Sequence, residues 1–279
     1  MEVIERTIKF TSRSFKLFVY PYSDAHLGSP GCAETSLIHK VKECANLGKN
    51  AVAIGVGDWA DCITSKDKRW NNNCIAPWVE RTNIVESQRE RIKAVFSPLV
   101  EQGQLLGIGT GNHEEAIHES HDDDLVRNVC KDLKTPYAGY HCFYVLHFER
   151  CGKRTHSLTI HAWHGSGAAQ SEGARVMRLM RLVNEFEADI YLMGHLHAKS
   201  TYETARLGLS NGRIWNKPIK AAITGSWLKA YDQPDEGQES DPSYVEKKGY
   251  KPAVIGMPVI EITPDNYNNP NEPEFEIKS

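Results

Sequence analysis

The segment AVAIGVGD, residues 51–58, is an apolar run that ends in a glycine and a carboxylate. It predicts a buried strand over 51–56 with Asp58 just beyond the end of the strand. Before it, 35–47 has apolar residues at the spacing of an amphipathic helix, and 15–20 predicts another strand. A strand, a helix and a second strand in this order form a βαβ unit. The sequence therefore predicts an α/β fold with a partly parallel sheet.

The rest of the chain continues this alternation. Helices are expected over 79–102, with a kink near Pro98, and over 172–186. Strands are expected over 105–109, 143–148, 157–161, 189–193, 221–224 and 253–262, and the polar stretch 66–77 predicts an inserted loop. Residues 143–161 predict a hairpin around Cys151-Gly152. We expect one domain over 1–263, followed by a tail or edge strand over 264–279, where Asn, Pro and Glu become frequent.

Composition narrows the classes of function. The 279 residues suffice for one large domain, and 33 Lys and Arg against 36 Asp and Glu give a formal charge of -3. That balance argues against a general polyanion-binding surface. Seven cysteines without a Cys-x-x-Cys spacing predict reduced thiols and a cytoplasmic protein. Since no run of 18 apolar residues occurs, no membrane partner is expected, and the sequence indicates no oligomeric state.

Five short polar segments each follow an apolar, strand-like run. They are D-A-H at 24–26, G-D at 57–58 with Asp61 three residues later, G-N-H-E at 111–114, H-G at 164–165, and G-H-L-H at 194–197. Carboxylate, carboxamide and imidazole groups are thus delivered from several strand ends to one edge of a sheet. Together they predict a site for a pair of divalent metal ions and, with it, hydrolysis of a phosphate ester.

A pair of metal ions needs a bridging carboxylate and terminal ligands of low charge. Asp58 is the predicted bridge between the ions. The remaining ligands are predicted to be Asp24, His26 and His197 for the first ion and Asn112, His164 and His195 for the second. Oxygen and imidazole donors without cysteine suit Mn, with Fe, Zn or Ni as alternatives, and do not suit a closed structural zinc site.

In this order the segments resemble the calcineurin-like metallophosphoesterase superfamily, whose pattern is D-x-H, G-D, G-N-H-[DE], an H before G, and G-H-x-H. The resemblance covers residues 24–197. It implies an αββα fold of four layers, in which two packed sheets are flanked by helices and the metals lie at the sheet edge. It also implies that His113 protonates the leaving oxygen or steadies the phosphate. Asp61 matches a carboxylate that orients this histidine in protein phosphatases of the family.

The sequence also departs from parts of that family. The protein phosphatases continue G-D-x-x-D-R-G, whereas this chain has Asp61-Cys62-Ile63 and lacks the phosphate-gripping arginine at that place. The paired histidines at 195 and 197 are more similar to the nuclease and phosphodiesterase branches. His161 competes with His164 for the fourth segment, and His164 is preferred because it directly precedes Gly165.

The substrate predicted from these features is a phosphate ester, with a nucleotide or a short single-stranded nucleic acid diester favoured. Trp59 and Trp163 adjoin predicted ligands and would stack a base if they lined the site, although packing under the loops is the commoner role. Lys66, Lys68 and Arg69 would hold phosphates or, more commonly, form a solvated charged run. The alternatives are a phosphomonoesterase and a scaffold that keeps the fold without catalysis.

Overall fold

In the computed structural model, the described residues are 1–279 without 72, 230, 232–243, 250, 266–272 and 279. Over these residues the chain forms two mixed sheets of six strands each. The first sheet has the order β1 (Glu2–Phe10), β6 (His141–Arg150), β7 (Lys153–Trp163), β8 (Ile190–Met193), β10 (Arg213–Thr224) and β9 (Lys199–Ser210). The second has the order β12 (Glu274–Lys278), β11 (Val259–Thr263), β2 (Leu17–Tyr22), β3 (Ala51–Gly55), β4 (Leu105–Gly109) and β5 (Tyr137–Gly139).

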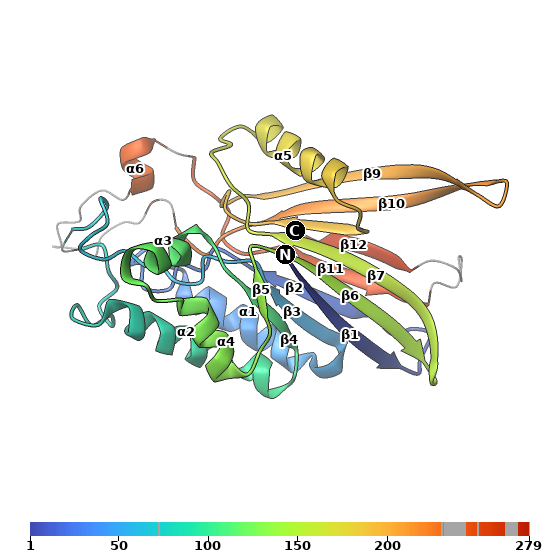
Figure 1. The fold of residues 1–279 in the computed structure, drawn as a ribbon, viewed down its shortest axis with the longest axis horizontal. Coiled ribbons are helices and arrows are strands. Elements are labelled where there is room, and N and C mark those ends of the chain that lie inside the picture. The colour runs from blue at the N-terminus through green and yellow to red at the C-terminus, as the bar shows by residue number, and fades with distance from the viewer. Residues whose placement is uncertain (72, 230, 232–243, 250, 266–272, 279) are drawn as a thin grey trace.

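Helices cover the outer faces of the two packed sheets. The helices are α1 (Glu34–Asn46), α2 (Ile84–Glu101), α3 (Asn112–His121), α4 (Leu125–Leu133), α5 (Glu172–Glu185) and α6 (Tyr244–Lys248), with a 3-10 turn at Gly48–Asn50. Figure 1 shows α1, α2 and α4 along one outer side and α5 along the other, beside β9 and β10. The predicted α/β sandwich of four layers is therefore confirmed.

Strand β3 shows how the sequence builds these layers. All five of its residues are buried, because a strand in the middle of a covered parallel sheet is packed on both faces. Val52 and Ile54 point into the core between the two sheets, where large β-branched side chains fill the space. Ala51 and Ala53 point the other way, into the core under the helices, and their small side chains let the helix layer approach the sheet.

The parallel pairing brings five strand ends to one side of the sandwich. Strand β3 pairs in parallel with β2 and β4, and β8 pairs in parallel with β7 and β10. The ends of β2, β3, β4, β7 and β8 are each followed within three residues by one of the predicted ligands. Open α/β sheets place ligand sites at the carboxyl ends of parallel strands, and both sheets here contribute to the same region.

The structure also shows where sequence patterns were insufficient. Strand β1, the long hairpin β9–β10 and helices α3 and α4 were not predicted; of the hairpin, only 221–224 was expected as strand. Helix α2 begins at Ile84, not at residue 79, because 75–79 packs into a separate small apolar cluster. Part of the predicted tail, 266–272, lies outside the described residues, and β12 forms an edge strand on β11.

Two further features bear on the sequence predictions, namely helix length and the state of the cysteines. No helix in the described ranges is both long and apolar enough to cross a bilayer. All seven cysteines are free thiols, and four of them are buried.

Candidate metal centre

Most of the predicted ligands lie on backbone that residues other than glycine seldom adopt. Five of the seven have φ angles in the left-handed region; they are Asp24 (50°), His26 (48°), Asp58 (54°), His195 (68°) and His197 (47°). A residue with a Cβ pays roughly 1–2 kcal/mol for this conformation. Strained backbone persists where the surrounding structure imposes it, and it gathers at functional sites. The loops therefore hold these side chains close together at the expense of backbone conformational energy, as is common at functional sites.

Two glycines allow the loops to approach one another. Gly57 has a φ of 110°, and a Cβ there would lie 2.7 Å from Nδ1 of His164. A Cβ on Gly111 would lie 2.1 Å from Oδ1 of Asp58. Both distances are far shorter than a carbon contact permits, so a side chain at either position would push a predicted ligand away.

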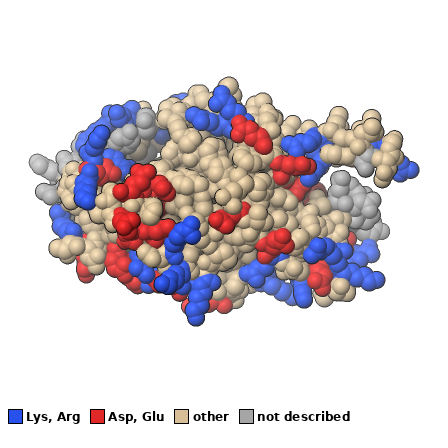
Figure 2. Space-filling model, in the orientation of Figure 1, with Lys and Arg blue, Asp and Glu red and all other residues tan. Residues whose placement is uncertain are grey.

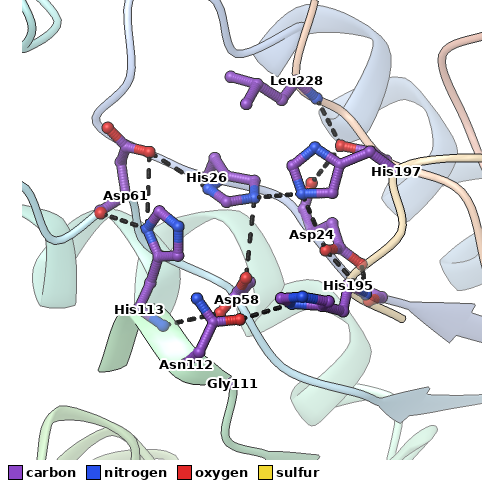
Figure 3. Close-up of polar contacts among 12 residues, drawn as sticks. Asp24, His26, Asp58, Asp61, Gly111, Asn112, His113, His195, His197 and Leu228 are labelled. Atoms are coloured by element: carbon purple, nitrogen blue, oxygen red, sulfur yellow. Dashed lines mark hydrogen bonds and ion pairs between the residues drawn. The ribbon is translucent and has the colours of Figure 1, made fainter. Parts of the chain in front are cut away.

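The first group of donor atoms comes from both sheets. Asp24, His26, Asp58 and His197 each offer an atom, and these atoms all lie within 4.8 Å of one another. Nε2 of His26 is 3.0 Å from Nε2 of His197, which in turn is 3.1 Å from Oδ1 of Asp24. Figure 3 shows these side chains turned toward a shared space. Two imidazole nitrogens that face each other this closely need a proton or a cation between them.

The second group shares Asp58 with the first. Asp58, His164 and His195 offer donor atoms within 4.8 Å of one another. Nε2 of His164 lies 3.2 Å from Oδ2 of Asp58 and 3.1 Å from Oδ1 of Asn112, and Oδ1 of Asn112 also lies 2.7 Å from Nδ1 of His195. Membership in both groups is what a bridging carboxylate requires. The structure thus brings all seven predicted ligands together.

The charges in this cluster fit a divalent cation. Asp24 and Asp58 are 0% and 1% exposed, and buried carboxylates are costly unless positive charge compensates them. Burial alone would raise the pKa of Asp58, but the charge of His164 holds it well below its usual range. Burial would lower the pKa of His164, but Asp58 raises it to about 9. Here protonated histidine compensates the charge of the buried carboxylates. Bound metal ions would supply this positive charge in place of the histidine protons.

His113 lies beside the two groups and is held by a main-chain carbonyl. Its Nδ1 is 2.6 Å from the carbonyl oxygen of Asp61, so Nδ1–H donates this bond. The carboxylate of Asp61 lies 3.2 Å from Nδ1 of His26 and 3.8 Å from Nδ1 of His113. The carboxylate thus makes its closer contact with a predicted ligand, and the carbonyl orients His113. Action of the Asp61 carboxylate on His113 stays a prediction.

Glu114 supports the site, although the sequence had assigned it no role. Its carboxylate is 2% exposed and accepts hydrogen bonds from four main-chain N–H groups, those of Asp58, Trp59, Ala60 and Gly111. Burial, and then the charge of Asp58, raise its pKa to about 7. The one available signal was its place as the last letter of G-N-H-E. The side chain joins the loop after β3 to the start of α3.

We expect Glu114→Ala to destabilise the protein strongly, because it leaves four buried N–H groups without an acceptor. Each unsatisfied buried donor costs about 1–3 kcal/mol, and even a loss of about 3 kcal/mol would lower the Tm by roughly 6–12 °C. Thermal melting followed by circular dichroism measures this. Glu119→Ala, an exposed change on the same helix, should melt close to wild type. A wild-type Tm for Glu114→Ala would contradict the supporting role.

His161 lies outside the cluster, in an aromatic environment. Its ring stacks on Phe186 at 4.3 Å between centroids, and its Nε2 is 3.4 Å from Nδ1 of His141. The structure therefore places His164, and not His161, in the group of possible donor atoms around Asp58, and its role as a ligand stays a prediction. Burial, and then His141, lower the pKa of His161 to about 4.

This shift predicts a pH-dependent contribution of His161 to stability. The unfolded histidine has a pKa of about 6.5 and binds a proton before the folded one does. Above pH 6.5 the ring is neutral in both states, so its burial causes no pH-dependent loss of the free energy of unfolding. This free energy then falls as the pH drops from 6.5 toward about 4. Urea denaturation across this range should show a shallower fall for His161→Phe than for wild type. His118→Gln, at an exposed position, should behave as wild type; equal slopes in all three proteins would contradict the assignment.

Of the two tryptophans that adjoin predicted ligands, Trp59 does not line the site as a base-stacking ring would. Trp59 is 1% exposed, donates its indole N–H to the carbonyl oxygen of Gly109 and packs edge-on against Phe96. The hypothesis that Trp59 stacks a base is therefore wrong, because its ring completes the core under the helices. Trp163 is half-buried, and one face of its ring lies on His141 at 5.2 Å between centroids.

Comparison with known proteins gives little beyond the geometry. No family model and no curated protein matches the chain. Among solved structures, a conserved uncharacterised protein of Streptococcus pneumoniae TIGR4, described as a predicted phosphoesterase, is 17% identical with a TM-score of 0.31. The match covers 94% of this chain and 98% of that one. GAP50, the anchor in the inner membrane complex of Plasmodium, is 14% identical with a TM-score of 0.37, over 89% and 81% of the two chains. Likeness at these TM-scores supports no functional conclusion.

Proposed function

We propose that this protein is a phosphoesterase that works with two divalent metal ions, with Mn as the first candidate and Fe, Zn or Ni as alternatives. The observation that carries the proposal is that one buried carboxylate, Asp58, belongs to two adjoining groups of oxygen and imidazole donors. Two ions bound there would activate water and neutralise the charge that develops on the phosphoryl group.

The residues around the donors have separable roles in this proposal. Asp24, His26 and His197 would hold one ion, and Asn112, His164 and His195 the other. The Asp61 carboxylate fixes the ring of His26 with Nε2 toward the site. His113, with Nδ1–H bound to a carbonyl, keeps Nε2 available to steady the phosphoryl group or to give a proton to the leaving oxygen. A scaffold without catalysis would not require this orientation.

The substrate class remains a proposal within this function. A phosphodiester of a nucleotide or short single strand is supported by the paired histidines at 195 and 197. The burial of Trp59 removes one argument for it and favours a phosphomonoester as the second candidate. Figure 2 shows acidic and basic side chains interspersed over one face of the molecule. Together with the net charge of -3, this suits a small substrate better than a long duplex.

Reconstitution with metal tests both parts of the proposal. Protein stripped of metal by a chelator should be inactive, and Mn²⁺ should restore hydrolysis of chromogenic esters. The paired substrates are p-nitrophenyl phosphate and bis-p-nitrophenyl phosphate, which differ only in monoester against diester. Faster turnover of the diester supports the phosphodiesterase, and the reverse supports the phosphomonoesterase. No hydrolysis of either ester with Mn, Fe, Zn or Ni would favour the scaffold.

A further inference from the structure

The inserted loop between β3 and α2 brings a cation to the edge of the candidate site. Nη1 of Arg69 lies 3.3 Å from Nε2 of His113, although 44 residues separate them along the chain. We infer that Arg69, where it adjoins His113, forms an oxyanion subsite that binds the unesterified oxygens of a phosphoryl group. The inference rests on the proposed phosphoesterase function and names the side chain that would grip its substrate.

The guanidinium of Arg69 is held on one edge and open on the other. Asp67 accepts hydrogen bonds from Nε at 3.0 Å and from Nη2 at 2.7 Å, and also from the main-chain N–H of Arg69 at 2.8 Å. These bonds fix the plane of the group and leave Nη1 pointing at His113. The side chain is 33% exposed, so solvent and a small anion can reach it. A planar, fixed guanidinium is the side chain best suited to pair with phosphate oxygens.

The loop itself is anchored on both sides of Arg69. On one side, Nζ of Lys66 donates to the carbonyl oxygen of Ser120 in α3 at 3.1 Å. On the other, the N–H of Ala76 donates to the carbonyl oxygen of Gly28 at 2.8 Å, just after the ligand His26. Between these anchors, Trp70 packs on an apolar cluster of the loop. The loop therefore presents Arg69 from a defined position.

The position of Arg69 shows how an anion would share this edge of the site with His113. Because Nδ1–H of His113 donates to the Asp61 carbonyl, Nε2 is the ring atom that lies beside Nη1 of Arg69. A phosphoryl oxygen that enters beside them can accept a hydrogen bond from Nη1–H of Arg69. The recognised chemistry is a tetrahedral oxyanion with at least two unesterified oxygens, which both phosphomonoesters and phosphodiesters provide.

Arg69 also accounts for the arginine that the sequence lacks after Asp61. The residue at that place, Cys62, is 4% exposed and its main-chain N–H donates to Oε1 of Gln88, so its side chain is part of the interior and offers no group to a substrate. The inserted loop returns a guanidinium to the site seven residues later in the chain. Sequence spacing alone favoured a solvated charged run for 66–69, because the fold of the loop decides where the charge lies.

Binding of inorganic phosphate tests the subsite without relying on turnover. Arg69→Met removes the charge and keeps an apolar stem, and Lys68→Met makes the same change at an exposed neighbour. In isothermal titration calorimetry of Mn²⁺-loaded protein, we expect Arg69→Met to weaken phosphate binding about tenfold or more. Lys68→Met should change it less than about twofold, since exposed charges are screened. Metal content and Tm, measured for each variant, should stay as in wild type.

Each outcome of these measurements either supports or overturns the subsite at Arg69. Unchanged phosphate affinity in a folded, metal-loaded Arg69→Met protein overturns the subsite, as does equal weakening in both variants, which would show a diffuse charge effect. Absence of phosphate binding by the wild-type protein also overturns it. If Arg69→Met loses its fold, Arg69→Gln replaces it under the same criteria. If wild type binds phosphate through Arg69 but hydrolyses neither ester, the subsite stands and the proposed function fails.

Discussion

Replacing Asp58 with Asn is expected to remove both metal ions and nearly all hydrolytic activity. Among the described residues, Asp58 is the one that belongs to both donor groups, with Oδ2 3.2 Å from Nε2 of His164 and 3.9 Å from Nε2 of His26. An amide keeps the shape but loses the negative charge that a bridge between two cations requires. Because bound metals contribute several kcal/mol of transition-state stabilisation, the loss should be at least about a thousandfold.

Elemental analysis of the purified variant measures the first effect, and hydrolysis of the paired chromogenic esters measures the second. Asp122→Asn is the matched control, because Asp122 is exposed in the left-handed position at the end of α3, where asparagine is also tolerated. It should keep both metals and full activity. Two metal ions per chain in Asp58→Asn would show that Asp58 is not the bridge.

The arrangement of the candidate site was largely predictable because its predicted ligands follow strand ends. A buried run such as 51–55 fixes both the strand and the exit point of Asp58, and parallel pairing then gathers several such exits at one place. The assignment of ligand roles remains a prediction until metal is measured, but the geometry brings the seven side chains together.

The parts that sequence reasoning missed depend on contacts between distant segments. Trp59 directly follows Asp58, yet its ring turns into the core and meets Phe96 of α2, which no local pattern reveals. Glu114 is bonded to N–H groups that lie more than 50 residues earlier in the chain. Arg69 lies in an irregular loop whose course is set by anchors to α3 and to the loop after β2. Sequence adjacency to a ligand indicates where the Cα of a residue lies, and tertiary packing decides the direction of its side chain.

His113→Ala is expected to keep both metal ions and to lose turnover by roughly 10²–10⁴-fold, the usual contribution of general acid catalysis. The imidazole is 9% exposed, and with Nδ1–H donating to the Asp61 carbonyl, only Nε2 is left to act on the substrate. To give a proton from Nε2 while Nδ1–H stays bonded, the ring must enter as the imidazolium. Metal content of the variant separates this role from ligation, because His113 also lies within 4.8 Å of the donor atoms of His26 and Asp61.

The leaving group distinguishes a proton donor from a group that only steadies the phosphate. A leaving oxygen of low pKa departs without a proton, so removal of His113 should cost little with a nitrophenyl ester and much with an alkyl ester. Rates of a series of esters with leaving groups of rising pKa, measured for wild type and His113→Ala, give two lines whose slopes should differ. Parallel lines would assign His113 to phosphoryl binding beside Arg69, since lost binding of the unesterified oxygens costs every ester the same. Loss of a metal ion from His113→Ala would make it a ligand and remove it from both roles.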